Sequence, residues 1–380
     1  MDQRRCVVNT IDDMVHEHYP FAEYKGIDLD EFSAELRSTL EVEDNSDVEF
    51  LGDVNYALRL LKDGHTRMEQ RFLQQPATAP LEVREDGDGR YFISVIDDED
   101  FAELRGRQVV AVDGEEVEQA LRRVGQWTET GEGGAVALSG LELALAGEAG
   151  TAVHLTLDGG EEVELDRRSM MEPPQAQILG DVGYIRLDTF GFIDDLERLD
   201  QAVNDVMNTR GLIIDIRSNG GGFPSVSDGL FGRLIDEEVA PFRLVHKNGE
   251  VAREMEARPR GQAYQGEVVV LVNGRSYSAS NFFAHRMTYH ERGVLIGERT
   301  GGGAASPKKG VQLLPGIWFQ VSSHLVLPPN GEHKESGIDP AIEVGPEDYE
   351  GGENTAPPGA LRVDGDPVIN RALRYLEELE

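Results

Sequence analysis

The sequence predicts an α/β protein whose sheet-containing core follows two smaller modules. Strand-like and helix-like segments alternate over residues 175–345, the pattern of strand–helix–strand crossover units with a mainly parallel sheet. Val268 to Val272 is an uninterrupted apolar run, which is typical of a strand buried on both faces. A chain of 380 residues exceeds one small core, so several domains are expected.

Residues 1–75 are predicted to form a helical domain. Apolar residues recur there at helical spacing: Val7, Val8, Ile11, Met14 and Val15 in one stripe, and Phe32, Leu36 and Leu40 in another. Ser46 and Glu49 have the spacing of a capping box that opens a third helix. His65 follows this helix in "LKDGHTRM"; a histidine in such a place is by itself expected on the surface.

Residues 80–168 change to short strands separated by glycine turns, which predicts a small β-rich module. The segment "LRGRQVVAVDGEEV" is similar to the strand–turn–strand of a PDZ domain, and a generic small β domain is the alternative. Residues 346–380 are expected to be an acidic Pro/Gly linker and a last helix, with Asp366 as N-cap and Pro367 at the first helical position.

The charge of the chain limits its partners. It has 71 acidic and 36 basic residues, a net charge of −35. Such a chain repels nucleic acid and anionic membranes, so both are discounted as partners. The same charge favours the hypothesis of a halophilic source, with an ordinary acidic protein as the alternative.

Two further observations bear on location and cofactors. No apolar run reaches the 18 or more residues of a membrane span, and no signal peptide is visible at the start. A cytoplasmic protein is therefore expected, and export of a trimmed precursor is the alternative. The single cysteine, Cys6, argues against an internal disulfide framework and a cysteine-rich metal site.

Two loops of the predicted sheet carry residues suited to acyl transfer. Asn219–Gly222 and Gly274–Ser280 both follow buried strands, and ligands of such sheets bind at the carboxyl ends of the strands. Ser278 stands between a strand and a helix, where the Ala279 N–H is a candidate oxyanion donor. Gly221, or else Gly220, is the candidate for the second donor. The alternatives are a helix-capping serine and a phosphate cradle, although "NGGG" lacks the lysine and Ser/Thr of a P-loop.

Five segments, "GYIRLDTF", "LIIDIRSNGGG", "LVNGRSYSASNFFA", "VLIGERTGGG" and "ESGIDPAIEV", fall in the order and spacing of peptidase family S41. The chain therefore resembles this family of C-terminal processing and tricorn-like peptidases. "YPFAEYKGIDLDEF" and "LKDGHTRM" extend the similarity towards the tricorn-like branch. The resemblance implies a crotonase- or ClpP-like α/β core, preceded by a helical segment and a PDZ-like module.

The resemblance also implies roles for particular residues. The family nucleophile falls on the first serine of "SAS", Ser278. Processing peptidases use a lysine as base, and the position of that lysine is occupied by Gly303 in this chain. The tricorn-like branch instead has a histidine ahead of the PDZ-like module, and His65 corresponds to it. A histidine suits the role because its unperturbed pKa is about 6.5. The acid that orients the base is expected at Glu335, with Glu298 as the alternative.

These observations predict a serine peptidase that acts on peptides or unfolded C-terminal tails without a metal or cofactor. One alternative is a non-catalytic protein that binds small apolar ligands on the same core. The other is a crotonase-like acyl-CoA enzyme, which would need basic residues around the cleft to bind the nucleotide, and this acidic chain has few of them. The physiological substrate, the cleavage preference, the oligomeric state and the source are left open.

Overall fold

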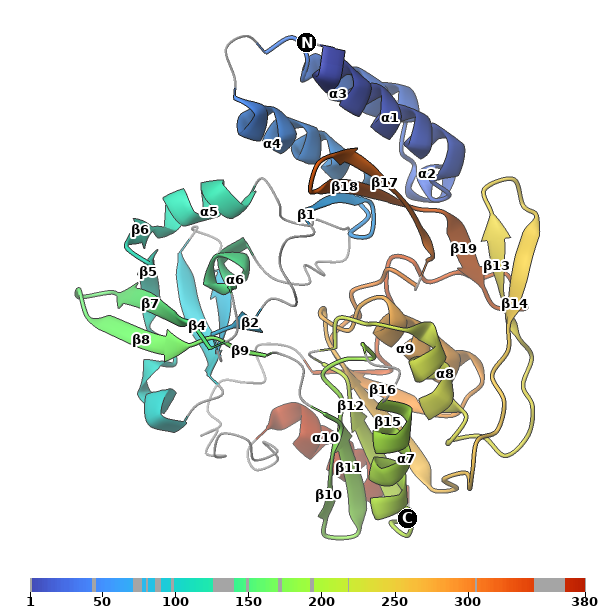
Figure 1. The fold of residues 1–380 in the computed structure, drawn as a ribbon. Helices are drawn as coiled ribbons and strands as arrows, with labels where there is room; N and C mark the ends of the chain where they lie inside the picture. The colour runs from blue at the N-terminus through green and yellow to red at the C-terminus, as the bar shows by residue number, and fades with distance from the viewer. Residues whose placement is uncertain are drawn as a thin grey trace.

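The computed structural model describes residues 2–42, 46–70, 77–79, 81–85, 90–96, 99–125, 140–147, 150–169, 173–191, 195–217, 219–304, 306–344 and 366–379. Figure 1 shows three parts: N-terminal helices, a β-rich module beside them, and an α/β core below. The N-terminus lies at the helical end of the molecule, and the C-terminus lies against the core.

The N-terminal helices are α1 (Asp2–His18), α2 (Ala22–Lys25), α3 (Leu29–Ser38) and α4 (Asp47–Leu58), followed by the 3-10 turn η1 (Arg59–Leu61). The predicted capping box of Ser46 and Glu49 is present at the start of α4. These helices pack on a three-stranded antiparallel sheet of β1 (Arg67–Gln70), β18 (Ile317–Ser322) and β17 (Lys308–Leu314). The predicted helical domain is therefore completed by two strands from the far end of the chain.

The β-rich module is an antiparallel sheet in the order β3-β4-β5-β7-β8, with β6 paired to β5. Its elements are β3 (Leu81–Glu85), β4 (Tyr91–Ile96), β5 (Gln108–Val112), β6 (Glu115–Glu116), β7 (Ala152–Leu157), β8 (Glu162–Asp166), η2 (Glu99–Leu104), α5 (Val117–Gly125) and α6 (Gly140–Leu145). A short pair, β2 (Ala77–Thr78) and β9 (Arg168–Ser169), joins its two ends. The module has an apolar core of its own, which is consistent with the predicted PDZ-like module.

The α/β core contains a six-stranded sheet in the order β10-β11-β12-β15-β16-β20. The strands are β10 (Gln175–Leu179), β11 (Val182–Arg186), β12 (Gly211–Asp215), β15 (Glu267–Val272), β16 (Val294–Gly297) and β20 (Ile342–Glu343). All neighbouring pairs are parallel except the edge pair β10 and β11. The predicted fold class, an α/β core with a mainly parallel sheet, is confirmed.

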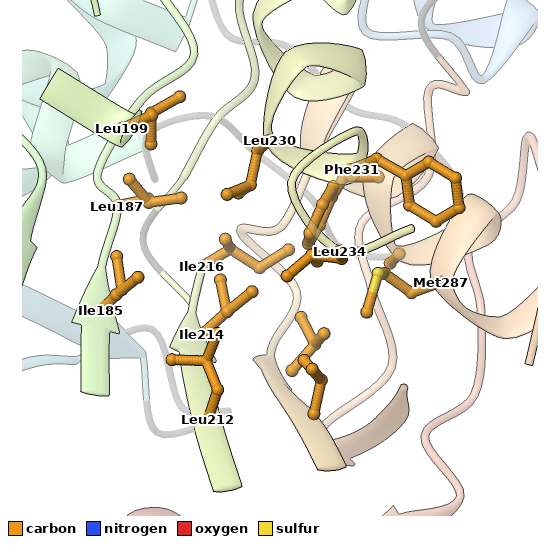
Figure 2. Close-up of a cluster of buried hydrophobic side chains, with 14 of the residues drawn as sticks. Ile185, Leu187, Leu199, Leu212, Ile214, Ile216, Leu230, Phe231, Leu234 and Met287 are labelled. Carbon is orange, nitrogen blue, oxygen red and sulfur yellow. The ribbon is translucent and has the colours of Figure 1, made fainter. Parts of the chain in front are cut away.

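Both faces of this sheet are covered by helices, which explains the consecutive apolar residues of its central strands β12 and β15. Leu212, Ile214 and Ile216 face α7 (Asp195–Asp205), α8 (Pro224–Phe231) and α9 (Ala279–Tyr289) on one side (Figure 2). The intervening Ile213, with Val269 and Leu271, packs against α10 (Pro367–Glu378) on the other side. The predicted last helix is thus part of the core, and the predicted linker before it lies outside the described residues.

A small antiparallel sheet, β14-β13-β19, lies at the edge of the core near the N-terminal helices (Figure 1). It consists of β13 (Phe242–His246), β14 (Val251–Met255) and β19 (His324–Leu327). Because β19 directly follows β18, this sheet connects the core to the sheet that carries the N-terminal helices. Within the described part of the chain, no helix is long and apolar enough to cross a membrane.

Candidate active site

Ser278 occupies a sharp turn between β15 and α9. Its backbone angles, φ 58° and ψ −116°, lie outside the regions that L-residues normally adopt, at a cost of about 1–3 kcal/mol. Two hydrogen bonds hold the turn: the Ser278 N–H donates to the Gly302 carbonyl at 2.9 Å, and the Phe282 N–H donates to the Ser278 carbonyl at 2.9 Å. The turn directs the serine side chain away from the sheet and places it at the N-terminal end of α9.

The other two serines of this segment have structural partners. The Ser276 hydroxyl donates to the Ile216 carbonyl at 2.8 Å, and the Ser280 hydroxyl donates to Asn219 Oδ1 at 2.6 Å. The Tyr277 N–H also donates to the Asn219 carbonyl, at 3.2 Å. Ser276 and Ser280 therefore join the serine turn to the glycine loop, and neither hydroxyl is available as a nucleophile.

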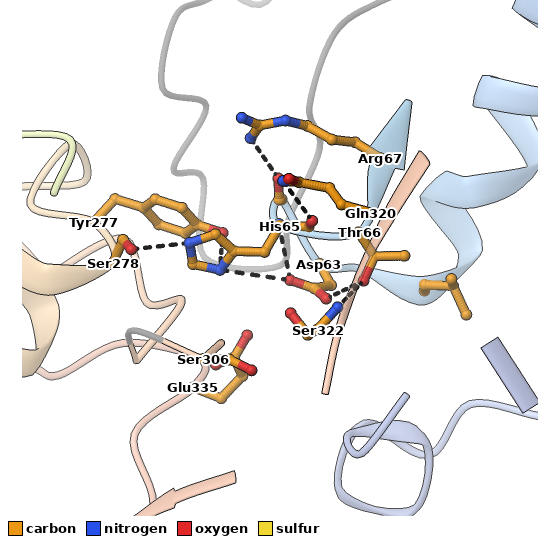
Figure 3. Close-up of polar contacts among 12 residues, drawn as sticks. Asp63, His65, Thr66, Arg67, Tyr277, Ser278, Ser306, Gln320, Ser322 and Glu335 are labelled. Atoms are coloured by element: carbon orange, nitrogen blue, oxygen red, sulfur yellow. Dashed lines mark hydrogen bonds and ion pairs between the residues drawn. The ribbon is translucent and has the colours of Figure 1, made fainter. Parts of the chain in front are cut away.

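His65 meets Ser278 although the two are far apart in the sequence. The His65 Nε2 and Ser278 Oγ atoms are 2.9 Å apart (Figure 3). Both residues are buried, with 4% of His65 and 7% of Ser278 exposed. The histidine expected on the surface from its local sequence is thus enclosed between the N-terminal segment and the core.

The loop that carries His65 is held by its neighbours on both sides. Asp63 Oδ1 accepts from the His65 N–H at 3.0 Å, and Asp63 Oδ2 accepts from the Thr66 hydroxyl at 2.5 Å. On the core side, the Gln320 side-chain amide donates to the His65 carbonyl at 3.1 Å, and the Ser322 N–H donates to the Thr66 hydroxyl at 3.1 Å. Strand β18 therefore holds the histidine loop in place over the serine.

Burial sets the protonation state of His65. It lowers the pKa of the imidazole well below 6.5, and the positive charges of Lys308, Arg67 and Lys25 lower it further. The neutral form therefore predominates at neutral pH. A neutral imidazole with a lone pair on Nε2 is able to accept the proton of Ser278.

The glycine loop packs directly behind the serine turn. Gly221 has φ +107°, and a Cβ there would lie 2.7 Å from Ser278 Cβ and 3.0 Å from the Ala279 nitrogen. The Gly221 N–H donates to Asn219 Oδ1 at 2.9 Å. The Gly221 amide is therefore bonded within the loop, and its role as an oxyanion donor stays a prediction.

Gly220 fits the donor role better. The residue is exposed, and its amide has no acceptor among the described residues. Ala279 is the first residue of α9, so its N–H is one of the amides that have no partner within the helix. The amides of Gly220 and Ala279 are therefore candidates for binding an oxyanion.

Glu335 is paired with Lys25. Its Oε1 is 3.5 Å from Lys25 Nζ, and Oε2 has no hydrogen-bond partner among the described residues. Burial is the main cause that raises the Glu335 pKa to about 8. No polar contact between Glu335 and His65 occurs in the described part of the chain, so the contacts do not support the predicted orienting role. The alternative, Glu298, follows β16, where its N–H donates to the Val272 carbonyl.

Two neighbours of His65 Nδ1 were not anticipated from the sequence. The Tyr277 hydroxyl lies 3.3 Å from Nδ1, and Asp63 Oδ1 lies 4.0 Å from it. Tyr277 directly precedes the serine, and Asp63 precedes the histidine by two residues. The sequence showed only that Tyr277 lies next to Ser278 and that Asp63 lies close to His65. It did not indicate that either side chain is near His65 Nδ1.

Gly303, which the resemblance places where processing peptidases have lysine, lies against the same pair. It has φ +79°, and a Cβ there would lie 2.6 Å from Tyr277 Cζ and 3.0 Å from His65 Cε1. The rings of Tyr277 and His65 therefore fill the space that a side chain at position 303 would need.

Residues 181–344 match the model of peptidase family S41. Over this stretch, which is somewhat less than half of the chain, the protein is similar to peptidase family S41. The S41 match covers the six-stranded sheet almost completely, together with the serine turn and the glycine loop, but not the segment that carries His65.

Several curated proteins have sequences similar to this chain. The chain is 28% identical over 211 residues to the tricorn protease of Thermoplasma volcanium, a match that covers 53% of this chain and 18% of the relative. It is 26% identical over 237 residues to the carboxy-terminal-processing protease of Bartonella bacilliformis, covering 57% of this chain and 53% of the relative. The chain thus spans about half or less of the length of these relatives.

A solved photosystem II D1 C-terminal processing protease has the same fold, with a TM-score of 0.59 and 20% sequence identity over 92% of this chain and 95% of that one. This similarity includes the modules before the core, so the predicted order of helical segment, PDZ-like module and S41 core is supported. Among the described residues, no group of three His, Cys, Asp or Glu side chains is placed to hold a metal ion.

Proposed function

We propose that this protein is a serine peptidase in which Ser278 is the nucleophile and His65 is the general base. The observation that carries the proposal is the 2.9 Å contact between His65 Nε2 and Ser278 Oγ, at a strained turn that begins a helix. A serine is a weak nucleophile unless an adjacent base removes its proton. The contact and the neutral state of His65 meet this requirement.

The reaction would proceed in two steps. Ser278 Oγ attacks the carbonyl carbon of the scissile bond while its proton moves to His65 Nε2. The amides of Ala279 and Gly220 then face the oxygen of the tetrahedral intermediate. The proton passes from His65 to the leaving amine, the C–N bond breaks, and an acyl-enzyme remains on Ser278. A water molecule, deprotonated by His65, releases the acyl group and restores the serine.

The proposed substrates are peptides or unfolded protein tails. Relatives of the chain are named a tail-specific protease and carboxy-terminal-processing proteases, which motivates this part of the proposal. The enclosed Ser278 and His65 leave little room for a folded chain, so an extended segment is the form of substrate that fits. We assign the PDZ-like module to substrate selection, because sheet edges of this kind accept a peptide as an added strand.

The alternative of a non-catalytic binding protein receives no support from the described residues. A binding site for a small apolar ligand requires neither a strained serine nor a histidine within hydrogen-bond distance of it. Both features carry an energetic cost, the first through backbone strain and the second through burial of an imidazole. Acyl transfer gives each of them a role.

A fluorescent alkyl fluorophosphonate, which forms a covalent bond with activated serines, tests the proposal directly. We expect stoichiometric labelling of Ser278, located by peptide mass mapping, and about 10³-fold slower labelling or none after Ser278→Ala or His65→Ala. Ser276→Ala is the matched control for a neighbouring hydroxyl. Absence of labelling in the folded wild-type protein, or equal labelling of the Ser278→Ala protein, would contradict the proposed function.

A further inference from the structure

Tyr277 is the closest side chain to the outer nitrogen of His65. Its hydroxyl lies 3.3 Å from Nδ1, and the two rings stack with their centroids 4.8 Å apart at an interplanar angle of 31° (Figure 3). Tyr277 is buried, with 6% of its surface exposed. The residue before the nucleophile therefore reaches around to the far side of the base.

Among the described residues, no carboxyl group makes a hydrogen bond to this nitrogen. Asp63 Oδ1 is 4.0 Å from Nδ1, beyond hydrogen-bond distance, and already accepts from the His65 backbone N–H. Glu335 points its Oε1 to Lys25 at 3.5 Å. The Tyr277 hydroxyl is thus the nearest possible acceptor for an Nδ1–H among the described side chains.

We propose that the Tyr277 hydroxyl accepts the hydrogen bond from His65 Nδ1–H, and that Tyr277 is the residue that positions the base for peptide hydrolysis. The inference rests on the proposed function of His65. It places a neutral phenol where serine hydrolases commonly use a carboxylate.

The direction of this hydrogen bond decides whether the histidine is competent. When Oη accepts from Nδ1–H, the Nε2 lone pair faces Ser278 and is free to take its proton. If Oη donated to Nδ1, Nε2 would carry the hydrogen and no proton could be transferred to it. After proton transfer both ring nitrogens of His65 carry hydrogen, so only an acceptor at Nδ1 stabilises the imidazolium.

The surroundings of Tyr277 favour a neutral hydroxyl that accepts. Burial is the main cause that raises the pKa of Tyr277 well above 10, and the negative charge of Asp63 raises it further. The phenol therefore keeps its proton over the working pH range. A neutral phenol oxygen retains lone pairs, so the Tyr277 hydroxyl is able to accept from Nδ1–H.

Gly303 provides the space for this arrangement. A Cβ at position 303 would lie 2.6 Å from both Cε2 and Cζ of Tyr277, and the positive φ of +79° further disfavours any other residue. Any larger residue there would push the phenol away from His65. The absence of a side chain at Gly303 therefore allows Tyr277 to lie beside His65.

The test compares Tyr277→Phe with Tyr289→Phe, which removes a hydroxyl from a half-buried tyrosine at the other end of α9. The second-order rate of labelling by the alkyl fluorophosphonate is measured from pH 4 to pH 9. We expect Tyr277→Phe to react roughly tenfold to 10²-fold more slowly than wild type, with the acid limb of its pH profile moved to lower pH. The downward shift is expected because the imidazolium loses its acceptor. Tyr289→Phe should match wild type in both respects.

Two outcomes would overturn the inference. One is a Tyr277→Phe protein with the wild-type rate and profile, and the other is a slower protein whose acid limb moves to higher pH, which would show that the hydroxyl donates. If Tyr277→Phe fails to fold, 3,5-difluorotyrosine at this position retains ring and hydroxyl but is a weaker acceptor, and the same downward shift is expected. A wild-type protein that is not labelled at all would contradict the proposed function itself, whereas labelled wild type with unaffected Tyr277→Phe contradicts only the role of Tyr277.

Discussion

The substitution Gly221→Ala should damage the nucleophile turn through backbone contacts alone. A methyl group at this position would lie 2.7 Å from Ser278 Cβ, 2.8 Å from the Tyr277 carbonyl oxygen and 3.0 Å from the Ala279 nitrogen. These atoms belong to the strained turn and the start of α9, so they have little freedom to move away.

The magnitude follows from two contributions. Gly221 has φ +107°, a conformation that costs an L-residue about 1–3 kcal/mol. Forcing an extra methyl group into a packed interior costs about 1–3 kcal/mol more. Together they predict a loss of about 2–6 kcal/mol in the free energy of unfolding of the S41 core, or a shift of the turn that relieves the overlap at the expense of activity.

Gly220→Ala is the matched control in the same loop. A Cβ on Gly220 would meet no atom within 4 Å, and its φ is not in the positive range. The substitution also keeps the amide that we assign to the oxyanion. We expect Gly220→Ala to stay within about 0.5 kcal/mol of the wild-type stability, as for an exposed position without special features.

The assay combines urea denaturation, followed by circular dichroism, with the rate of fluorophosphonate labelling at pH 7. Gly221→Ala should unfold at lower urea concentration, label more slowly, or both, while Gly220→Ala should keep the wild-type stability. The reasoning is refuted if Gly221→Ala equals wild type in stability and labelling rate, or if Gly220→Ala is the more destabilising of the two.

Five further predictions concern protonation and charge. The rate of turnover of an unfolded peptide tests the identity of the base. His65→Ala should lower this rate as severely as Ser278→Ala does, whereas the Lys308→Ala/Lys309→Ala double variant should stay within about tenfold of wild type. The pKa of His65 is lowered well below 6.5, so kcat/KM should rise with pH through a step below 6.5 and be level at neutrality; a step above 7 would contradict the buried histidine base. Lys308 contributes to this lowering, so its removal alone should move the step to higher pH. The pKa of Glu335 is raised from 4.5 to about 8, so the folded state binds this proton more tightly than the unfolded state does. The free energy of unfolding should therefore fall by about 5 kcal/mol as the pH rises from 4.5 to 8, and Glu335→Gln should abolish that fall. Equal pH slopes in denaturant titrations of the two proteins would refute this prediction. With a net charge of −35, the melting temperature should rise between low and molar KCl if the chain is adapted to salt, and a flat profile would contradict a halophilic origin.

The pH prediction for His65 differs from the expectation of an unperturbed histidine. The sequence supplies only the residue type, whose ordinary pKa is about 6.5. The structure encloses the ring beside three positive charges, and both effects disfavour the imidazolium. The direction of the shift therefore depended on contacts between segments that are distant in the chain.

The sequence by itself determined the elements whose signals are local. Alternating apolar runs and amphipathic segments predicted the parallel sheet and its helices, because burial on both faces of β12 and β15 requires consecutive apolar residues in these strands. The strand–turn–helix around Ser278 was equally legible, since a buried run followed by Asn273–Gly274 and a helix is a local pattern. The pairing of Ser278 with His65 required the family resemblance as well, because nothing near His65 indicates its partner.

Tertiary structure alone decided which atoms these residues contact. It bonded the hydroxyls of Ser276 and Ser280 to other groups, engaged the Gly221 amide with Asn219, and turned Glu335 to Lys25. It also placed Tyr277 at His65 Nδ1. The physical reason is that a hydrogen bond depends on distances of about 3 Å, whereas sequence patterns report only which face of an element is buried. Segments that are far apart in the chain acquire such distances only once the helices, the β18 strand and the core are packed together.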